Sequence, residues 1–457
     1  MARLFLVLSF AAGLVVADTD PQIWGFGEHT TGGALAPGKS IYTVKNFNEL
    51  RTALKNGGKP DDPKIIYIDG VLDGDYLADG TLATEAYYAR NTQYTWERYL
   101  NSFNSTLKAI LGNSTDPADA EELKIIEAQE THRQAASKEQ EKQIAVRIGN
   151  NTSIQSVEKA KFANIQNAYL AINFTDNVIL RNFEIYSPID LFPEWDPTDG
   201  ALGNWNSKYD GVGIVTSSNI WIDHLTLSDG DHPDSEEPIV FGKRVQRHDG
   251  LIDITEGSDG VTLSFNKFLD HDKTHLIGNN DAGNLGPGDT GKLHVTMYGN
   301  HYFNSIQRSP RVRFGDVHVF NNFYQGISSG NEKITYYIGM GINSTILSER
   351  NAFEINGTES MTTKTKLVIG NYNGYKFKDV GSTVNGTDVD LEAIAKTKFD
   401  TAKATQIAAA AAAGKAVAEW ATHEYTNEVF APDYFYRQKK TEDVKKWVLA
   451  NAGFGNL

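Results

Sequence analysis

Five eight-residue segments in the middle of the chain align with one another without gaps, and they predict a repetitive fold. The segments begin at Val178, Ile220, Val261, Val295 and Val317. In every segment the first and third residues are apolar and the eighth is a large apolar residue. This alternation is typical of a strand that buries one face. Because the spacing between successive starts varies, a unit of fixed length is joined by loops of variable length, as in a parallel β-helix solenoid.

A second regularity supports a solenoid. The sixth residue of the last three segments is Asn266, Asn300 and Asn322. Stacked asparagine side chains can hydrogen-bond to one another and to the backbone of turns, one coil above the next. The competing architecture is a β-propeller, but its blades need four strands each at more regular spacing. We therefore expect an all-β fold built as a parallel β-helix.

The remaining segments predict additions to this solenoid. Residues 1–17 combine a short apolar run with small residues at their end, which predicts a cleaved signal peptide; a membrane anchor is the alternative. Residues 18–457 are then expected to form a single β-helix domain. The charged segment at about 76–143 predicts a helical insertion that supplies no catalytic group. The segment at about 390–457, which contains an alanine-rich run, predicts a helical C-terminal cap.

Composition and charge narrow the class of protein. The 457 residues carry 43 Lys and Arg against 58 Asp and Glu, a net charge of −15, and include no cysteine. A nucleic-acid partner held by general electrostatics is therefore not expected, and disulfides, thiolate metal sites and a cysteine nucleophile are excluded. After signal cleavage we expect a secreted, extracellular monomer with no membrane contact. Sequons that fit a secreted glycoprotein occur at Asn104, Asn113, Asn150, Asn151, Asn173, Asn343, Asn356 and Asn385.

Three arginines within six residues, Arg308, Arg311 and Arg313, form a cationic patch on this acidic chain. In an extended segment Arg311 and Arg313 point to one face, while Pro310 fixes the backbone and redirects Arg308. Lys273 belongs to the run His271-Asp272-Lys273-Thr274 that comes after the third repeated segment, and it is expected on the same side of the solenoid. The alternative interpretation of the arginines is a set of surface ion pairs.

Acidic residues gather around the neighbouring turns. Asp210, Asp249 and Asp253 are expected in loops of adjacent coils. Oxygen ligands from separate turns suit Ca²⁺, whose coordination is flexible and rich in oxygen. The acidic segment 229–237 is interpreted as a solvated loop. A bound cation or the arginine patch would be needed to hold an anionic substrate against the net negative charge.

Six short motifs occur in a fixed order along the repeated region. They are Trp205-Asn206, Tyr209-Asp210, Trp221-Ile222-Asp223-His224, His248-Asp249-Gly250, His271-Asp272-Lys273 and Arg308-Ser309-Pro310-Arg311-Val312-Arg313. Together they resemble the pectate lyases of polysaccharide lyase family 1. The resemblance implies a right-handed parallel β-helix, Ca²⁺ dependence and β-elimination of polygalacturonate, a plant cell-wall polysaccharide.

The same resemblance implies a role for each matched residue. It assigns Asp210, Asp249 and Asp253 as calcium ligands. It assigns Lys273 and Arg313 to substrate binding and Arg308 as the catalytic base. It assigns Asp223, His224 and Pro310 to structural roles near the site.

Other functions stay open on the same fold. A pectin lyase, which acts on methyl-esterified pectin, would not need the acidic metal ligands. A β-helix that only binds cell-wall glycan would not need Arg308, and a hydrolase would use a carboxylate pair as acid and base. In the insertion, Tyr94, Trp96 and Tyr99 either line a distant sugar subsite or pin the insertion to the β-helix.

Overall fold

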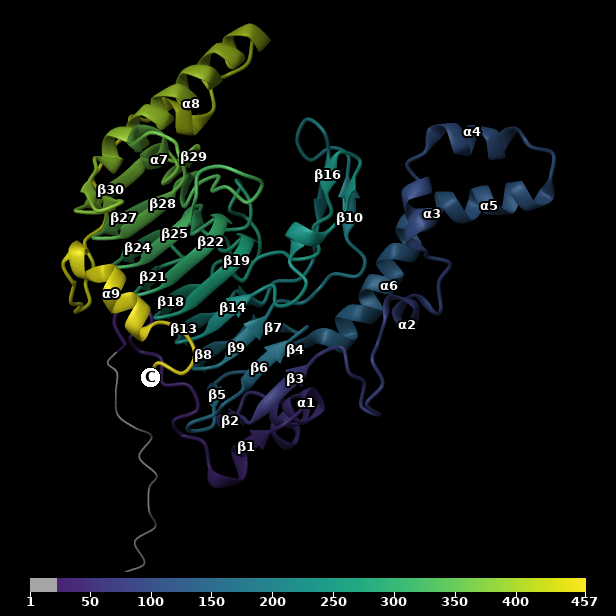
Figure 1. Cartoon of the computed structure of the whole chain (residues 1–457), viewed down its shortest axis with the longest axis horizontal. Helices are drawn as coiled ribbons and strands as arrows, with labels where there is room; N and C mark the ends of the chain where they lie inside the picture. The colour runs from purple at the N-terminus through teal and green to yellow at the C-terminus, as the bar shows by residue number, and fades with distance from the viewer. Residues whose placement is uncertain (1–22) are drawn as a thin grey trace, which may run out of the picture.

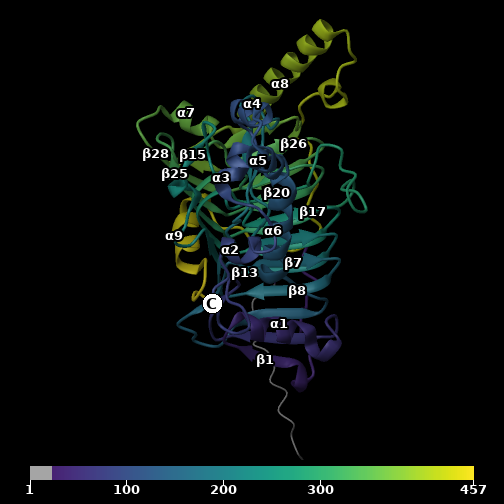
Figure 2. The same ribbon diagram turned by 90° about the vertical axis from the view of Figure 1, so that its right-hand side faces the viewer.

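The computed structural model describes residues 23–457, and the predicted signal peptide at residues 1–17 lies outside them. The described chain winds into a right-handed parallel β-helix, so the predicted fold is confirmed (Figure 1). Each complete coil contributes one strand to each of three long sheets. The coils stack along one axis (Figure 2). The apolar side chains that point inward form one continuous core.

The three sheets run the length of the solenoid, and their paired strands are parallel except for β31 and β32. The first sheet contains β1 (Ile41–Val44), β2 (Lys64–Ile68), β5 (Thr152–Ser156), β8 (Asp176–Arg181), β13 (Ser218–Asp223), β18 (Asp259–Ser264), β21 (Val295–Tyr298), β24 (Asp316–Phe320), β27 (Thr345–Glu349) and β30 (Lys376–Val380). The second contains β3 (Gly70–Asp73), β6 (Ala163–Gln166), β9 (Glu184–Tyr186), β14 (Thr226–Ser228), β19 (Lys267–Lys273), β22 (His301–Gln307), β25 (Phe323–Ile327), β28 (Ala352–Asn356), β31 (Thr383–Val384) and β32 (Thr387–Asp388). The third contains β4 (Ala145–Arg147), β7 (Tyr169–Asn173), β12 (Val212–Val215), β17 (Ile252–Thr255), β20 (Leu276–Ile277), β23 (Arg311–Val312), β26 (Ile338–Gly341) and β29 (Ile369–Tyr372).

The five repeated segments lie in register in the first sheet. Val178, Ile220, Val261, Val295 and Val317 face one another in consecutive pairs along β8, β13, β18, β21 and β24. Each is fully buried, as the apolar alternation requires. The alignment read from the sequence is therefore the pairing register of the sheet.

Each repeated segment is nevertheless not one strand, which corrects the simplest interpretation of its pattern. The fifth residue has a left-handed backbone at every level, with φ between 50° and 67° for Asn182, His224, Phe265, Gly299 and Asn321. Such a residue turns the chain sharply. The segment therefore spans the end of a strand in the first sheet, a bend, and the start of a strand in the second sheet.

The predicted asparagine stack forms just after these bends. The Asn266 amide donates to Asn300 Oδ1 at 3.1 Å, and the Asn300 amide donates to Asn322 Oδ1 at 3.0 Å. Asn351 extends the stack by one coil, because it accepts from Asn322 at 3.1 Å. Each amide also bonds backbone groups of the bend, which satisfies polar atoms that are wholly buried.

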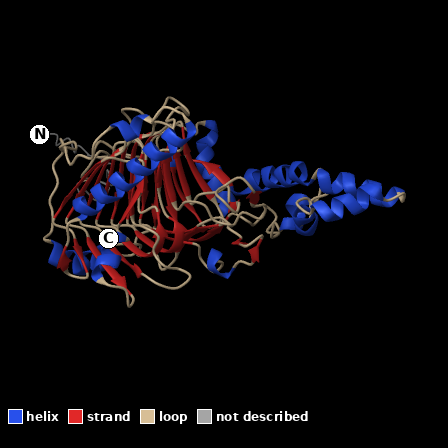
Figure 3. Cartoon of the chain, turned by 90° about the horizontal axis from the view of Figure 1, so that it is seen from above, coloured by secondary structure: helices blue, strands red, loops and turns tan. Residues whose placement is uncertain are grey.

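The predicted insertion contains five helices between β3 and β4. They are α2 (Glu85–Ala89), α3 (Trp96–Asn101), α4 (Ser105–Asn113), α5 (Pro117–Glu127) and α6 (Gln129–Ile144). The outer helices project sideways from the solenoid as a narrow arm (Figure 3). The helix α1 (Phe47–Lys55) buries Phe47 and Leu50 in the core at the N-terminal end.

The C-terminal segment covers two surfaces. The helix α8 (Leu391–Ala413) inserts Leu391 and Ala395 into the end of the core, while its alanine-rich half extends outward (Figure 1). The helix α9 (Thr441–Asn451) packs Val444 and Val448 against Phe323 on the flank of the second sheet. A short helix, α7 (Met361–Lys366), precedes β29. Within residues 23–457, no helix combines the length and apolar character that crossing a membrane requires.

Candidate active site

Three aspartates lie where adjacent coils enter the third sheet. Asp210 lies two residues before β12, Asp249 lies three residues before β17, and Asp253 lies within β17. Asp210 Oδ1 accepts a hydrogen bond of 2.9 Å from the backbone N–H of Gly250. Asp253 Oδ1 accepts one of 2.9 Å from the backbone N–H of Leu276, on the next coil. Parallel stacking thus brings together carboxylates that are up to 43 residues apart in the chain.

These carboxyl groups repel one another in a poorly solvated setting. Burial, with the charges of Asp253 and Asp249 in addition, holds the pKa of Asp210 well above its ordinary value. Burial and the charge of Asp249 raise the pKa of Asp253 to about 7. Burial also acts to raise the pKa of Asp249, but the charge of Lys273 outweighs it and the pKa lies below its ordinary value. The cluster therefore holds more negative charge than its surroundings neutralise.

Lys273 is the cation closest to these acids. It ends β19, its side chain is only 8% exposed, and its Nζ lies 2.9 Å from Asp249 Oδ1. Lys273 pairs in register with Gln307, the last residue of β22. The next residue along that strand's path is Arg308, so the lysine and the first arginine of the patch lie on adjacent coils, as the sequence predicts.

The three arginines of the patch have different surroundings. Arg308 occupies the bend between β22 and β23, with φ 59°. Burial acts to lower its pKa, but the charges of Asp253 and Asp249 outweigh burial and raise it. Arg311 places its guanidinium carbon 4.1 Å from the centre of the Tyr372 ring.

Arg313 is held by a carboxylate outside the three-aspartate cluster and by two backbone carbonyl groups. Its Nε donates to Asp281 Oδ1 at 2.7 Å, and its Nη1 donates to the carbonyl oxygens of Gly278 and Asn279. Only 12% of its side chain is exposed. These hydrogen bonds fix the guanidinium of Arg313, the last arginine of the patch.

Two of the expected structural residues lie elsewhere on the solenoid. Asp223 and His224 occupy the bend between the first and second sheets, whereas the acids and Arg308 lie where the second sheet leads into the third. Asp223 is fully buried and accepts hydrogen bonds from Arg181 at 3.0 Å, Ser264 at 2.6 Å and His224 at 2.7 Å. The expectation that this pair lies near the site is therefore wrong, and it crosslinks coils instead. Pro310 lies within the arginine patch, after a cis peptide bond.

The sequence interpretation missed a buried network behind the site. His271 donates from Nδ1 to Asp229 Oδ1 at 2.6 Å and from Nε2 to the Asp249 carbonyl oxygen at 2.7 Å. Asp229 also accepts from Ser187 at 3.0 Å and is 6% exposed. Asp229 and Asp234 belong to the acidic segment 229–237 interpreted as a solvated loop, but both are buried. His248 and His271 both lie close to Asp229, and the presence of histidines in the neighbouring coils is the sequence signal that could have indicated a buried acid here.

The aromatic residues of the insertion pin it to the β-helix. Tyr99 is fully buried, and its hydroxyl accepts from the backbone N–H of Trp195 at 2.9 Å. Tyr94 packs against Phe192, and Trp96 lies 5.2 Å from the Trp205 ring centre. These contacts form a second apolar cluster between the insertion and the loops of the solenoid. The pinning role is thus the one the packing supports.

The acidic cluster has suitable donors for a hard cation, although it is not a closed cage. Among residues 23–457 no three His, Cys, Asp or Glu side chains converge tightly enough to hold a metal in their present orientations. Asp249 faces Lys273, while Asp210 and Asp253 accept backbone N–H groups. All three donors are carboxylate oxygens, the ligand class that Ca²⁺ prefers. A dication would also relieve the repulsion that raises two of their pKa values.

The comparisons with known proteins agree with this geometry. The family model for pectate lyase matches residues 99–457. The chain belongs to the pectate lyase family. A curated pectate lyase of Bacillus subtilis is 37% identical over 400 residues, which cover 85% of this chain and 89% of that protein. Pectate lyase D of Dickeya chrysanthemi is 32% identical over 95% of this chain and 88% of its own length.

Solved pectate lyase structures share the whole architecture. A thermostable pectate lyase superposes with a TM-score of 0.78 at 33% identity, covering 95% of this chain and 97% of the other. A pectate lyase bound to a hexasaccharide has the same TM-score and coverage at 31% identity. This pectate lyase family member is therefore a polysaccharide lyase with the β-helix of its relatives.

Proposed function

We propose that this protein is a Ca²⁺-dependent pectate lyase that cleaves polygalacturonate by β-elimination and releases 4,5-unsaturated oligogalacturonides. The observation that carries this is the assembly of Asp210, Asp249 and Asp253 beside Lys273 and Arg308 on adjacent coils. The relatives and solved neighbours are named pectate lyases, and one of them binds a hexasaccharide. A pectin lyase or a non-catalytic β-helix has no use for both the acids and the cations.

The difficult step is removal of the C5 proton beside a uronate carboxylate that is already negative. When bound at the three aspartates, Ca²⁺ would withdraw charge from that carboxylate and neutralise the acids that raise the pKa of Arg308. Lys273 and Arg313 supply fixed positive charge to the substrate carboxylates. Both are held by ion pairs, with Asp249 and Asp281, so their positions are set before substrate binds.

Arg308 accepts the proton in this mechanism. A guanidinium is normally protonated throughout the accessible pH range, so only its neutral fraction can act as the base. The C5–H electron pair forms the C4–C5 double bond, the C4–O4 bond breaks, and O4 takes a proton from solvent. Arg308 ends the step protonated and returns its proton to water. Alkaline pH favours the neutral fraction.

Absorbance of the unsaturated uronide during incubation with polygalacturonate, with and without chelator, tests the activity and the metal together. We expect product with Ca²⁺ and none with excess chelator; full activity in chelator would overturn the metal assignment. Arg308→Lys keeps a positive charge but changes the proton acceptor, so turnover should fall at least ~100-fold. Arg350→Lys is a matched control, because Arg350 also has a left-handed backbone, with φ 49°, at a different bend.

We also propose that the protein is secreted after cleavage of residues 1–17 and acts as a monomer. The sequence pattern at the N-terminus and the sequons support export. Sequencing the N-terminus of the protein from culture medium should give Asp18, and retention of Met1 would contradict cleavage. Light scattering should give the mass of one glycosylated chain.

A further inference from the structure

A buried chain of hydrogen bonds lies directly behind the three aspartates and joins them to the second sheet. Asp229 follows β14 and accepts from the Ser187 hydroxyl at 3.0 Å and from His271 Nδ1 at 2.6 Å. Ser187 follows β9 and His271 lies within β19, and these three strands are neighbours in the second sheet. Each of the three side chains is at most 6% exposed. The orientation of the His271 ring is therefore set by the two coils that precede it.

The other ring nitrogen of His271 reaches the peptide group that joins Asp249 to Gly250. Nε2 donates to the Asp249 carbonyl oxygen at 2.7 Å. The N–H of the same peptide group belongs to Gly250 and donates to Asp210 Oδ1 at 2.9 Å. Because a peptide group is planar, fixing its carbonyl end also fixes the direction in which its N–H points. His271 thus orients the group that sets the position of the Asp210 carboxylate.

The third aspartate packs against the same peptide group. The space beside Gly250 is so narrow that a Cβ there would lie 2.2 Å from Asp253 Oδ1. No helix or strand lies between β16 (Lys243–Arg244) and β17 in this described part of the chain, so a regular hydrogen-bond ladder does not hold the segment. Its shape depends on contacts such as the one from His271 to Asp249. All three aspartates therefore meet at a peptide group whose orientation His271 controls.

The strand that carries His271 also reaches the carboxylate of Asp249. Lys273 follows His271 by two residues in β19, and both are buried. Residues two apart in a strand face the same side of the sheet. Lys273 places its Nζ 2.9 Å from Asp249 Oδ1. One strand thus holds Asp249 at two points, its main chain through His271 and its carboxylate through Lys273.

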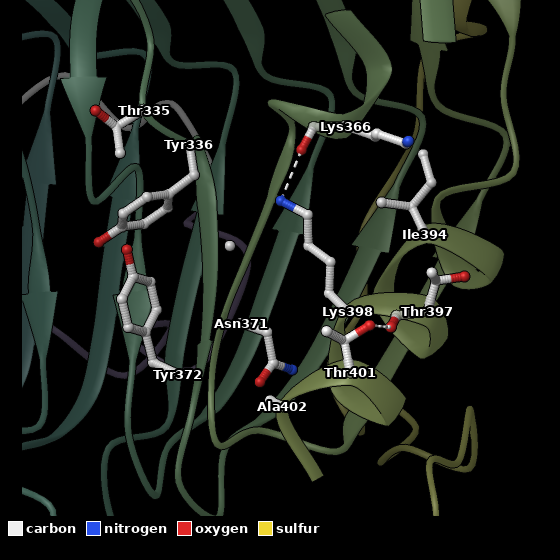
Figure 4. Close-up of a pocket in the computed structure, with 11 residues that line it drawn as sticks. Thr335, Tyr336, Lys366, Asn371, Tyr372, Ile394, Thr397, Lys398, Thr401 and Ala402 are labelled. Carbon is white, nitrogen blue, oxygen red and sulfur yellow. Dashed lines mark hydrogen bonds between the residues drawn. The ribbon is translucent and has the colours of Figure 1, made fainter. Parts of the chain in front are cut away.

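The arginine half of the site is supported by other residues. The Arg311 guanidinium carbon lies 4.1 Å from the centre of the Tyr372 ring. Tyr372 and Tyr336 line a pocket of about 550 Å³ between the third sheet and α8, and their hydroxyls point toward one another (Figure 4). As far as the described chain goes, the lining of this pocket includes neither Asp229 nor His271. A change at His271 should therefore disturb the acids without removing the support of the arginines.

We propose that His271 and Asp229 are positioning residues, which hold the peptide group between Asp249 and Gly250 so that the three aspartates are arranged for Ca²⁺ before it binds. Their role rests on the proposed function and adds to it two residues that determine calcium affinity. Both ring nitrogens of His271 are occupied by hydrogen bonds within the protein, so the ring contacts neither ion nor substrate. Residues that orient metal ligands typically contribute about 10- to 100-fold to metal affinity.

Calorimetric titration of the purified, chelator-treated protein with Ca²⁺ measures this affinity directly. His271→Asn keeps a donor near Nδ1 but loses the donor at Nε2, so calcium affinity should fall at least ~10-fold. His271→Gln places its donor near Nε2 and should retain more of the affinity. At saturating Ca²⁺ the kcat of both variants on polygalacturonate should stay within about threefold of the wild-type value, because the arginines keep their support.

His224→Asn is the matched control. His224 is also buried, and its Nδ1 lies 2.7 Å from Asp223 Oδ2, but this pair lies at the bend between the first and second sheets. Asparagine tolerates the left-handed backbone of this position, where φ is 52°. A loss of melting temperature shared with His271→Asn measures the general effect of losing a buried histidine, while calcium affinity should equal that of the wild type.

Asp229→Asn is a second probe of the same role. It keeps the shape of the side chain but replaces a charged acceptor of the His271 N–H with a neutral one, so it should also weaken calcium binding. If His271→Asn does not fold, the comparison of Asp229→Asn with His224→Asn decides.

The outcomes separate the positioning role from the activity. Wild-type calcium affinity in His271→Asn and Asp229→Asn would overturn the positioning role and leave the lyase function intact. An equal loss in His224→Asn would also overturn it, because a general loosening of the coils would then explain the effect. Equal losses in His271→Asn and His271→Gln would overturn the role of the bond to the Asp249 carbonyl oxygen. No unsaturated product from the wild type would instead overturn the proposed function.

Discussion

Replacing Lys273 with methionine tests how charge is arranged at the proposed centre. Methionine keeps most of the side-chain length but removes the cation that lies 2.9 Å from Asp249. Removing one partner of a buried ion pair typically costs about 3–5 kcal/mol, because the remaining charge is left uncompensated. Asp249 keeps 31% of its side chain exposed, so we expect a value near the lower end, about 3 kcal/mol.

Thermal unfolding converts this free energy into a shift. The unfolding entropy of a chain of this length is about 0.9 kcal/mol/K near its melting temperature, so Lys273→Met should melt roughly 3 °C lower in chelator at pH 8. Added Ca²⁺ should raise the melting temperature of the variant more than that of the wild type, because a dication replaces the missing positive charge beside Asp249. Turnover should stay low, since Ca²⁺ does not restore the lost contact to substrate.

Two further variants make this result decisive. Lys267→Met removes a charge from the start of the same strand, where Lys267 is half-buried and forms no ion pair within the described chain, and should change the melting temperature little. The double variant Lys273→Met with Asp249→Asn removes both charges and should recover part of the lost stability. A Lys273→Met protein that melts like wild type in chelator would refute the claim that this ion pair compensates a buried acid. A variant that gains nothing from Ca²⁺ would refute the cation site.

Three other outcomes follow from the geometry. Calcium affinity should fall as pH drops below about 7, because Ca²⁺ must then displace protons from Asp210 and from Asp253, whose pKa is raised to about 7. Calorimetry in two buffers should detect this proton release at pH 6. Asn300→Ala should lower the free energy of unfolding by about 3–5 kcal/mol, since it leaves buried polar groups of two neighbouring coils unpaired, and chemical denaturation would measure this. Combined alanine substitution of Tyr94 and Tyr99 should expose the insertion to protease while leaving kcat/KM on trigalacturonate unchanged; a collapse of that value would contradict a non-catalytic insertion.

Part of the site could be predicted from the sequence because its residues occur in local motifs. Only a few residues separate Asp249 from Asp253, and the same is true of Arg308 and Arg313. Strand geometry therefore nearly fixes the relative placement within each pair. The link between the acids and Lys273 needed the resemblance, since it depends on which coils are adjacent. The bond from His271 to the Asp249 carbonyl oxygen joins residues 22 apart, and nothing in their spacing indicates it.

The sequence by itself determined the repeat. Apolar alternation fixed which residues of each coil face inward, and the asparagine positions fixed where the stack forms. Both features depend only on neighbouring residues within a coil and on the equivalent residues of the next coil. The tertiary structure alone decided the bend at the fifth residue of each segment, the position of Asp223 away from the acids, and the pocket beneath α8. These features depend on contacts between segments far apart in the chain, and local periodicity carries no information about such contacts.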